Sequence, residues 1–236
     1  MNKVLIITHD FEPLNSIGAK RPESWFRYFN SHGLYPIVLC RHWNAPPKDE
    51  TDYFQKSHIS EPQIEEKTHG TIVRYPYQGT PKDRIIAKYG MNRKAFLRKA
   101  YSLIEFFLGF KIPMFDPTPD VIQIAGDYLA RHQDVMAILA TGEPWRNFKY
   151  ASILSQQSGV PWIADYRDGW STNVSYLTGL YARLIYRPIS RYREKKIVGT
   201  CAAISISDPC EVPKIKKLFP KKNIRNIFNG YELGDL

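Results

Sequence analysis

Charged side chains follow several apolar stretches of this sequence, and carboxylates are among them. Asp165 and Asp168 flank Arg167 directly after the apolar run that begins at Pro161, and Glu143 follows an earlier run of the same kind. Carboxylates beside a guanidinium can bind and orient a polar substrate, or they can form a local salt-bridge network. Asp165, Asp168 and Glu143 are therefore candidate catalytic residues, and Arg167 is a candidate substrate-binding residue.

Polar residues also follow the first and the last apolar runs. His9 and Asp10 come after the first run, and Asn229 and Gly230 come after the last one. His9 either faces a ligand or packs against its neighbours, while Asn229 and Gly230 have the composition of a turn or hinge. Trp145, in the turn after Glu143, completes the set of candidate binding residues at these positions.

Several common chemistries have no motif here. The sequence contains neither G-x-x-x-x-G-K-[ST] nor G-x-G-x-x-G after the first apolar run, which disfavours P-loop and ordinary nicotinamide-binding proteins. It contains no G-x-S-x-G and no H-x-x-x-H, which disfavours an α/β-hydrolase and a helical zinc site. The three cysteines form no C-x-x-C pair, so neither a zinc site nor a disulfide framework is indicated. No bound metal and no cofactor is expected.

The first 40 residues predict a strand, a loop, a helix and a second strand. Residues 4–8 are β-branched and apolar, residues 9–21 form the loop, Pro22 suits the first turn of a helix, and residues 35–40 form the next strand. Free backbone N–H groups at such a helix start can bind a phosphate. In this loop, Gly18 either faces a phosphate or sugar or makes a turn, and Arg21 either contacts a ligand or pairs on the surface.

The rest of the chain continues the alternation of strands and helices. Residues 44–70 read as a long irregular segment, and helices are expected over 93–111, 116–130, 148–157 and 176–198. Further strands are expected at 71–77, 135–140, 161–165, 202–207 and 224–230. This order predicts an α/β fold with a Rossmann-like, doubly wound parallel sheet of about seven strands. Ligands of such sheets bind outside the carboxyl ends of the strands, where the candidate residues lie.

The net charge of +10, from 33 Lys+Arg and 23 Asp+Glu, predicts an anionic partner or simply high solubility. Residues 82–111 are strongly basic, and the helix at 93–111 is aromatic on several faces, so it forms either core packing or an in-plane contact with an anionic membrane. The sequence has no leader-like start and no apolar run near 18 residues. A cytoplasmic location is expected, with peripheral contact on the inner face of the cell membrane as an extension of it.

The order of several short motifs resembles that of a known family. The segments are Glu12-Pro13 with Ser16–Arg21, Thr141–Trp145, Pro161–Trp170, Ser205–Ser207 and Ile227–Tyr231. They are similar to the P-P-x-x-x-x-G-[GA]-x-R, T-x-P-P-x-S, P-W-x-x-D-F-R-D-P-W, V-S and I-x-N-G-[YV]-D segments in the N-terminal domain of GT-B glycosyltransferases of the family 4 (group 1) type. Glu12 and Gly169 stand where prolines are usual, and the turn at Glu143 lacks the histidine of many relatives.

This resemblance implies an enzyme that moves a sugar from a nucleotide diphosphate sugar to an acceptor, with retention of configuration and without a metal. The acceptor would belong to polysaccharide, lipopolysaccharide or glycolipid synthesis and could be lipid-linked. Residues 1–236 would be the acceptor-side domain, and the nucleotide-sugar domain with its E-x7-E segment would be absent, so the chain alone is expected to be inactive. With this resemblance, the candidate catalytic residues are Asp168, Glu143 and Asp165, and the candidate substrate-binding residues are His9, Gly18, Arg21, Trp145, Arg167, Asn229 and Gly230.

Two other functions remain open from the sequence. A GT-B type sugar-nucleotide epimerase would keep the same architecture. A non-enzymatic basic α/β module could instead bind nucleic acid through residues 82–111 and 214–225, with affinity that falls steeply with salt. Nucleic acid is not the favoured partner, because the sequence lacks the aromatic and helix-turn-helix signatures of common nucleic-acid-binding folds.

Overall fold

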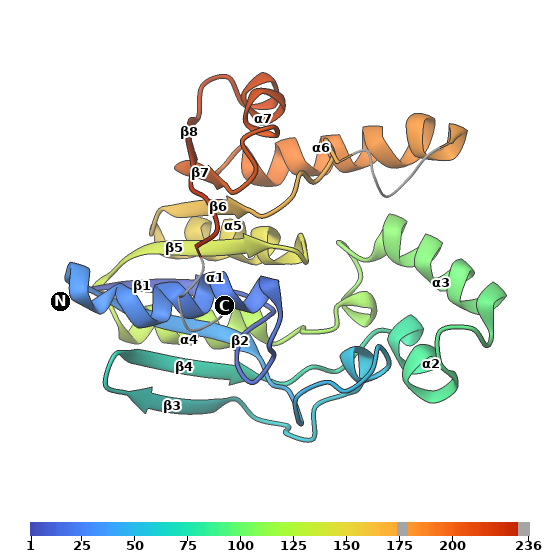
Figure 1. Ribbon diagram of the computed structural model, residues 1–236, viewed down its shortest axis with the longest axis horizontal. Coiled ribbons are helices and arrows are strands. Elements are labelled where there is room, and N and C mark those ends of the chain that lie inside the picture. The colour runs from blue at the N-terminus through green and yellow to red at the C-terminus, as the bar shows by residue number, and fades with distance from the viewer. Residues whose placement is uncertain (174–178, 231–236) are drawn as a thin grey trace.

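A computed structural model describes residues 1–173 and 179–230, which form one sheet with helices on both faces (Figure 1). The strand order is β3-β4-β2-β1-β5-β6-β7-β8, and all neighbours are parallel except the hairpin of β3 and β4. The strands are β1 (Asn2–Ile7), β2 (Leu34–Arg41), β3 (Gln63–Lys67), β4 (Gly70–Tyr75), β5 (Val135–Gly142), β6 (Trp162–Tyr166), β7 (Ala203–Ile206) and β8 (Asn223–Asn226).

The helices are α1 (Ile17–Tyr28), α2 (Pro81–Tyr89), α3 (Ala95–Leu108), α4 (Val121–Arg131), α5 (Arg146–Ser158), α6 (Arg187–Val198) and α7 (Val212–Leu218). Short 3-10 turns cover Asn30–His32, Asp52–Phe54 and Pro113–Phe115, and a π-helical turn covers Ala182–Tyr186. In Figure 1, α1 crosses one face of the sheet, and α4 and α5 lie behind the other. Helices α2 and α3 lie beyond the carboxyl ends of the strands.

Alternation along the strands supplies both faces of the sheet with apolar side chains. Leu5 and Ile7 belong to the larger core, which α4 and α5 cover, whereas Val4 and Ile6 belong to the smaller core beneath α1. Successive side chains of a strand point to opposite faces, so a continuous apolar run is what a sheet covered on both sides requires. The predicted α/β, doubly wound fold is confirmed.

Successive strands are added to opposite sides of β1 in the two halves of the chain. It adds β2 and β4 on one side of β1, and then returns to add β5, β6, β7 and β8 on the other. The crevice between the carboxyl ends of β1 and β5 is therefore the topological switch point, the usual ligand site of open α/β sheets. Thr141 Oγ1 donates a hydrogen bond to Thr8 Oγ1 at 3.2 Å across this crevice.

The segment at 44–70 contains a strand that the sequence did not predict. Strand β3 has the sequence Gln-Ile-Glu-Glu-Lys, all of its residues are exposed, and it pairs antiparallel with β4 at the edge of the sheet. An edge strand covered on neither face needs no alternating apolar pattern, so the periodicity that identifies buried strands is missing there.

The first helix begins earlier than predicted, at Ile17 rather than at Pro22. The Ser16 side chain accepts a hydrogen bond from the Ala19 backbone N–H at 3.1 Å, which caps the helix at this point. Gly18 and Arg21 therefore lie in the first turns of α1 and not in a loop. Pro22 is inside the helix, where its missing N–H leaves the Gly18 carbonyl without its i→i−4 hydrogen bond.

Two boundaries near the end of the chain also differ. Strand β8 ends at Asn226, so Asn229 and Gly230 follow the strand by three and four residues instead of closing it. The helix predicted over 176–198 includes residues 176–178, which lie outside the described residues. Its described part is helical through the π turn and α6 to Val198.

No helix in 1–173 or 179–230 is long and apolar enough to cross a membrane.

Candidate functional site

The sheet register brings the predicted polar positions to one edge. Gly142 pairs with Tyr166, Tyr166 with Ile206, and Ile206 with Asn226, so four neighbouring strands end at the same level. The residues that follow these ends, together with His9 and Asp10 after β1, therefore emerge on one side of the sheet. This edge is the candidate active site.

Asp10 and Arg167 meet at the switch point. The Nη1 atom of Arg167 lies 3.7 Å from Oδ2 of Asp10, and the Ser16 hydroxyl donates a hydrogen bond to the same carboxylate oxygen at 3.4 Å. Gly18 packs directly against this pair, and a Cβ there would collide with Nη1 of Arg167 and Oδ2 of Asp10. The absence of a side chain at Gly18 thus allows the start of α1 to approach the ion pair.

Glu143 lies within electrostatic reach of the same group. Burial raises the pKa of the Glu143 carboxyl above its ordinary value, the negative charge of Asp168 raises it further, and Arg167 opposes the rise. Burial also raises the pKa of Asp10, again against Arg167. Asp10, Glu143 and Asp168, which follow β1, β5 and β6, thus lie near one arginine, and the pKa values of Asp10 and Glu143 are raised.

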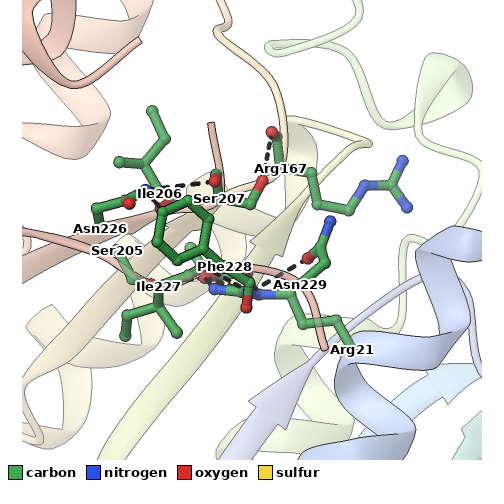
Figure 2. A network of polar contacts seen from close by, with 10 residues as sticks. Arg21, Arg167, Ser205, Ile206, Ser207, Asn226, Ile227, Phe228 and Asn229 are labelled. Carbon is green, nitrogen blue, oxygen red and sulfur yellow. Dashed lines mark hydrogen bonds and ion pairs between the residues drawn. The ribbon is translucent and has the colours of Figure 1, made fainter. Parts of the chain in front are cut away.

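Arg21 belongs to the polar network of Figure 2, and Asp165 is its buried ion-pair partner. Arg21 Nη2 donates to Asp165 Oδ1 at 2.7 Å, and Arg21 Nε donates to Asp165 Oδ2 at 3.0 Å. The Ser205 hydroxyl donates to Asp165 Oδ1 at 2.6 Å. Asp165 is 0% exposed and Arg21 7% exposed. Both carboxylate oxygens of Asp165 are therefore engaged with partners from α1 and β7.

The same arginine holds the segment after β8. Arg21 Nη1 donates to the carbonyl oxygens of Ile227 at 2.9 Å and Phe228 at 3.2 Å, and to Asn229 Oδ1 at 3.2 Å. In Figure 2 the Arg167 side chain extends away from this network, while its backbone oxygen accepts a hydrogen bond from Ser207 at 2.8 Å. The predicted binding residues therefore separate into two groups, one with Arg167 and one with Arg21.

A cavity of about 620 Å³ lies between α1 and the segment after β8, and the predicted residues Arg21, Asn229 and Gly230 line it. Its other walls include large apolar side chains that are exposed, Ile17 at 82% and Phe228 at 67%. This volume is in the range of small-molecule sites, about 300–1,000 Å³. The cavity is open to a ligand or to a second protein surface.

Trp145 packs in an aromatic stack at the start of α5. Its ring lies parallel to that of Trp170 with centroids 5.3 Å apart, and Trp170 in turn stacks on Phe110 at 5.9 Å. A Cβ on Gly142 would collide with the Trp145 ring, so this ring lies against the backbone of the last residue of β5. The structure therefore places Trp145 next to Glu143 and gives it a packing partner.

The His9 side chain packs against residues at or after the ends of β2 and β4. Its ring makes edge contacts with Trp43 and Tyr77, both at 5.8 Å, and its Nε2 lies 3.4 Å from Arg41 Nη1. Burial and the Arg41 charge lower the pKa of His9 to about 3. The imidazole is therefore neutral at physiological pH.

The sequence analysis did not assign roles to three residues that the structure brings to this edge. Asp10 pairs with Arg167, Ser205 bonds to Asp165, and Arg41 contacts His9. Asp10 was recognisable as the polar neighbour of His9 at a strand end. Ser205 and Arg41 lie within strands, and sequence spacing gives no signal for their partners. Within the described residues, no three His, Cys, Asp or Glu side chains gather in a geometry that could hold a metal ion.

Comparison with known sequences finds no matching family model and no matching curated protein. Several solved structures are similar in fold, among them the following three. A sucrose-phosphate synthase from Thermosynechococcus elongatus has a TM-score of 0.53 at 15% identity, over 98% of this chain and 90% of that one. The catalytic domain of starch synthase IV from Arabidopsis thaliana, bound to ADP and acarbose, has 0.56 at 10% identity, over 99% and 52%.

The third is UGT2 from Phytolacca americana, complexed with UDP-2-fluoro-glucose and pterostilbene. It has a TM-score of 0.51 at 10% identity, over 100% of this chain and 56% of that one. The chain thus spans about half the length of two of the three structures. At these identities the similarity shows the fold alone, a Rossmann-like α/β sheet like that in these GT-B glycosyltransferases.

Proposed function

We propose that the chain is the N-terminal, acceptor-binding half of a GT-B glycosyltransferase of the family 4 type. The complete enzyme transfers a sugar from a nucleotide diphosphate sugar to an acceptor hydroxyl, with retention of configuration and without a metal. The observation that carries this proposal is the position of Glu143. Its carboxyl group lies at the switch point, in the electrostatic field of Asp168, Arg167 and Asp10, on a fold shared with sugar-transferring enzymes.

The three candidate carboxylates have different roles in this proposal. Glu143 and Asp168 orient the acceptor hydroxyl, and a carboxyl group with a raised pKa is suited to exchanging a proton with it. Asp165 acts through Arg21 as a positioning residue, because Arg21 and Ser205 already engage both of its oxygens. Arg167 stabilises negative charge that develops between the carboxylates. Electrostatic stabilisation of this kind is the largest contribution to catalysis in many enzymes.

The donor is bound mainly by a second domain in this proposal. Gly18 lets the start of α1 approach Arg167, and the backbone N–H groups of that first turn can donate to a diphosphate. The exposed apolar side chains of Ile17 and Phe228 at the 620 Å³ cavity form a surface for the second domain to cover. Asn229 and Gly230 are the hinge of domain closure, which excludes water from the reaction.

The acceptor belongs to a polysaccharide, lipopolysaccharide or glycolipid, and helix α3 brings the site to a membrane. No residue of α3 is buried, and its first turns carry Arg98 and Lys99 beside the exposed Phe96 and Leu97. Such a helix can insert its apolar side chains at a lipid interface while its cations face anionic headgroups. In Figure 1, α3 lies beyond the carboxyl ends of the strands, on the same side as the candidate site.

Asp168→Asn in the full-length enzyme tests the proposal. We expect a fall in turnover of about 10²–10⁴-fold, because a positioned acid or base contributes an effect of that size. Asp127→Asn, on the exposed face of α4, removes the same charge at a distance and should leave turnover unchanged. Transfer from UDP- and GDP-sugars is measured together with the fraction of folded protein for each variant. Normal turnover per folded molecule of Asp168→Asn would contradict the proposal.

The isolated 236-residue chain provides a second test. Calorimetry should find only weak binding of UDP- and GDP-sugars and no turnover, because most of the diphosphate contacts belong to the second domain. A dissociation constant near 1 µM, about −8 kcal/mol, would mean that this chain itself contains the donor site.

A further inference from the structure

A second polar site lies at the end of β2, next to the carboxylates of Asp10, Glu143 and Asp168 but separate from them. Arg41 is the last residue of β2 and Trp43 follows it closely, and only 2% and 5% of their surfaces are exposed. The guanidinium carbon of Arg41 lies 3.9 Å from the centre of the Trp43 ring and 3.6 Å from that of Tyr77. A cation is thus held in one orientation between two aromatic faces.

Arg41 has no ionic partner in the part of the chain that the structure describes. Its Nη1 and Nη2 atoms donate to the carbonyl oxygens of Tyr53 at 2.6 Å and Gln55 at 2.9 Å, which are neutral acceptors. The carboxylates that act on the pKa of Arg41 have other partners. Asp83 accepts a hydrogen bond from the Tyr77 hydroxyl at 2.8 Å, and Asp10 pairs with Arg167. Burial lowers the pKa of Arg41 to about 10, so the side chain is still a cation at neutral pH.

Two buried donors beside this charge have no acceptor among the described residues. They are Arg41 Nε and the indole Nε1 of Trp43. Both residues line a cavity of about 220 Å³, whose other polar lining residues are Asn44, Lys48, Asp52 and Gln55. The Asp52 carboxylate bonds to neither donor. It accepts from the Lys48 backbone N–H at 2.8 Å and from the Gln55 amide at 2.7 Å.

A buried charge and buried donors without partners are unfavourable, and an anion that enters the cavity as these side chains turn toward it would satisfy both. We propose that this cavity binds an oxyanion, a carboxylate or phosphate group, in which Arg41 Nε–H and Trp43 Nε1–H donate to its oxygens. Lys48, exposed at the rim, adds a second positive charge. The cavity is smaller than the usual 300–1,000 Å³ of whole-ligand sites, about the size for one charged substituent.

The cavity adjoins the switch point through His9. This residue touches Arg41 on one side and precedes Asp10 on the other, and its neutral imidazole adds no charge between the two sites. The identity of the carrier rests on the proposed function: the oxyanion belongs to the acceptor, and its binding places an acceptor hydroxyl toward Glu143. The acceptor class is therefore an acidic or phosphorylated sugar.

The test follows the Trp43 indole N–H by NMR. The chain has five tryptophans, and Trp43→Phe identifies which indole signal belongs to Trp43. The ¹⁵N-labelled chain is titrated with glucuronate, glucose 6-phosphate and glucose at constant ionic strength. We expect at least one of the two anions to shift the Trp43 signal, and glucose to leave it unchanged. A shift with glucuronate alone assigns a carboxylate, and a shift with the phosphate alone assigns a phosphoryl group.

Calorimetry with the shifting anion gives the matching affinity. Trp43→Phe keeps an aromatic ring on Arg41 but removes one donor, and it should weaken binding about tenfold, the typical loss of a hydrogen bond to a charged group. No shift with either anion, or an equal shift with glucose, would overturn the proposal and would mean that the cavity holds only water. Sugar transfer by the full-length enzyme without an anion shift contradicts this site alone, and an anion shift without transfer contradicts the proposed function alone.

Discussion

The guanidinium of Arg21 and the carboxylate of Asp165 come from positions 144 residues apart and lie 2.7 Å apart. This buried pair joins α1 to the end of β6. Because the same guanidinium also binds the carbonyl oxygens of Ile227 and Phe228, it fixes three segments around the candidate site. The pair therefore connects the stability of the fold to the geometry of the site.

Asp165→Asn should lower the free energy of unfolding by about 3–5 kcal/mol, because it leaves Arg21 as a buried charge without its partner. Urea denaturation followed by circular dichroism measures this change. The control is Glu65→Gln, which breaks the exposed pair with Arg74 and should cost at most about 1 kcal/mol. Equal effects of the two substitutions would mean that the buried pair contributes no more than a surface one.

Glu143→Gln should stabilise the protein at neutral pH. The folded protein holds the Glu143 proton more tightly than the unfolded chain does, so stability falls as the pH rises from the unfolded pKa, near 4.5, through the higher folded pKa. Glutamine resembles the neutral carboxyl group and removes this loss. Thermal melts should show a higher Tm than wild type at pH 7 and the same Tm at about pH 3.5.

The exposed Glu66→Gln on β3 is the control for this pH comparison, with no expected difference at either pH. A Glu143→Gln variant that is less stable than wild type at pH 7 would show that the ionised carboxylate makes favourable contacts in the fold.

Gly18→Ala should change activity more than stability. The added methyl group would displace the end of the Arg167 side chain from Asp10, and the end of an arginine can move at little cost. We expect turnover of the full-length enzyme to fall at least about tenfold while the free energy of unfolding changes by less than about 1 kcal/mol. Unchanged turnover would remove the Asp10–Arg167 pair from the mechanism.

Gly126→Ala is the matched control for this substitution. Gly126 lies within α4, and a Cβ there would meet only Leu154 at 3.9 Å, an ordinary contact. Replacing a helical glycine by alanine stabilises a helix by about 1 kcal/mol, so this variant should be slightly more stable and fully active.

Replacing Arg93, Lys94, Arg98 and Lys99 by glutamine should abolish binding to anionic vesicles. Each cation near an anionic surface contributes about 1 kcal/mol, so the four together contribute about 4 kcal/mol before screening by salt. Sedimentation with anionic and neutral vesicles measures binding. Phe96, 83% exposed at the start of α3, supplies apolar contact that charge alone would not give.

A variant with Lys216, Lys217, Lys221 and Arg225 replaced by glutamine has the same net charge and carries its changes around α7 and β8. It should bind vesicles as wild type does. Equal loss in both variants would indicate general attraction by net charge, and binding to neither kind of vesicle by wild type would mean that α3 has another role.

The sequence predicted the seven parallel strands because each one carries an apolar signal of its own. Strand β1 is the clearest case, since Val4 to Ile7 serve two cores at once. The start of α1 was misplaced because Pro22 is an obvious marker of a helix start, whereas the cap at Ser16 depends on a single hydrogen bond to Ala19. Local patterns locate elements better than they locate the ends of those elements.

The candidate site was predicted as a set of positions and not as a set of contacts. The alternation of strands and helices is enough to bring Glu143, Arg167 and His9 to one edge. It does not indicate that Asp165 binds Arg21, while its neighbour Asp168 adds to the field at Glu143. Such pairings depend on side-chain directions across 144 residues of sequence, and no local spacing encodes them.

Strand β3, which carried no hydrophobic signal, has a consequence for how copies of this protein behave toward each other. It forms one margin of the sheet, and its outward backbone groups could accept a strand from another molecule. Glu65, Glu66 and Lys67 place charges along that margin, and the opposite margin is the short strand β8 with Arg225. Charges on short outer strands oppose the growth of a continuous sheet between molecules, so these residues protect the protein from aggregation at high concentration.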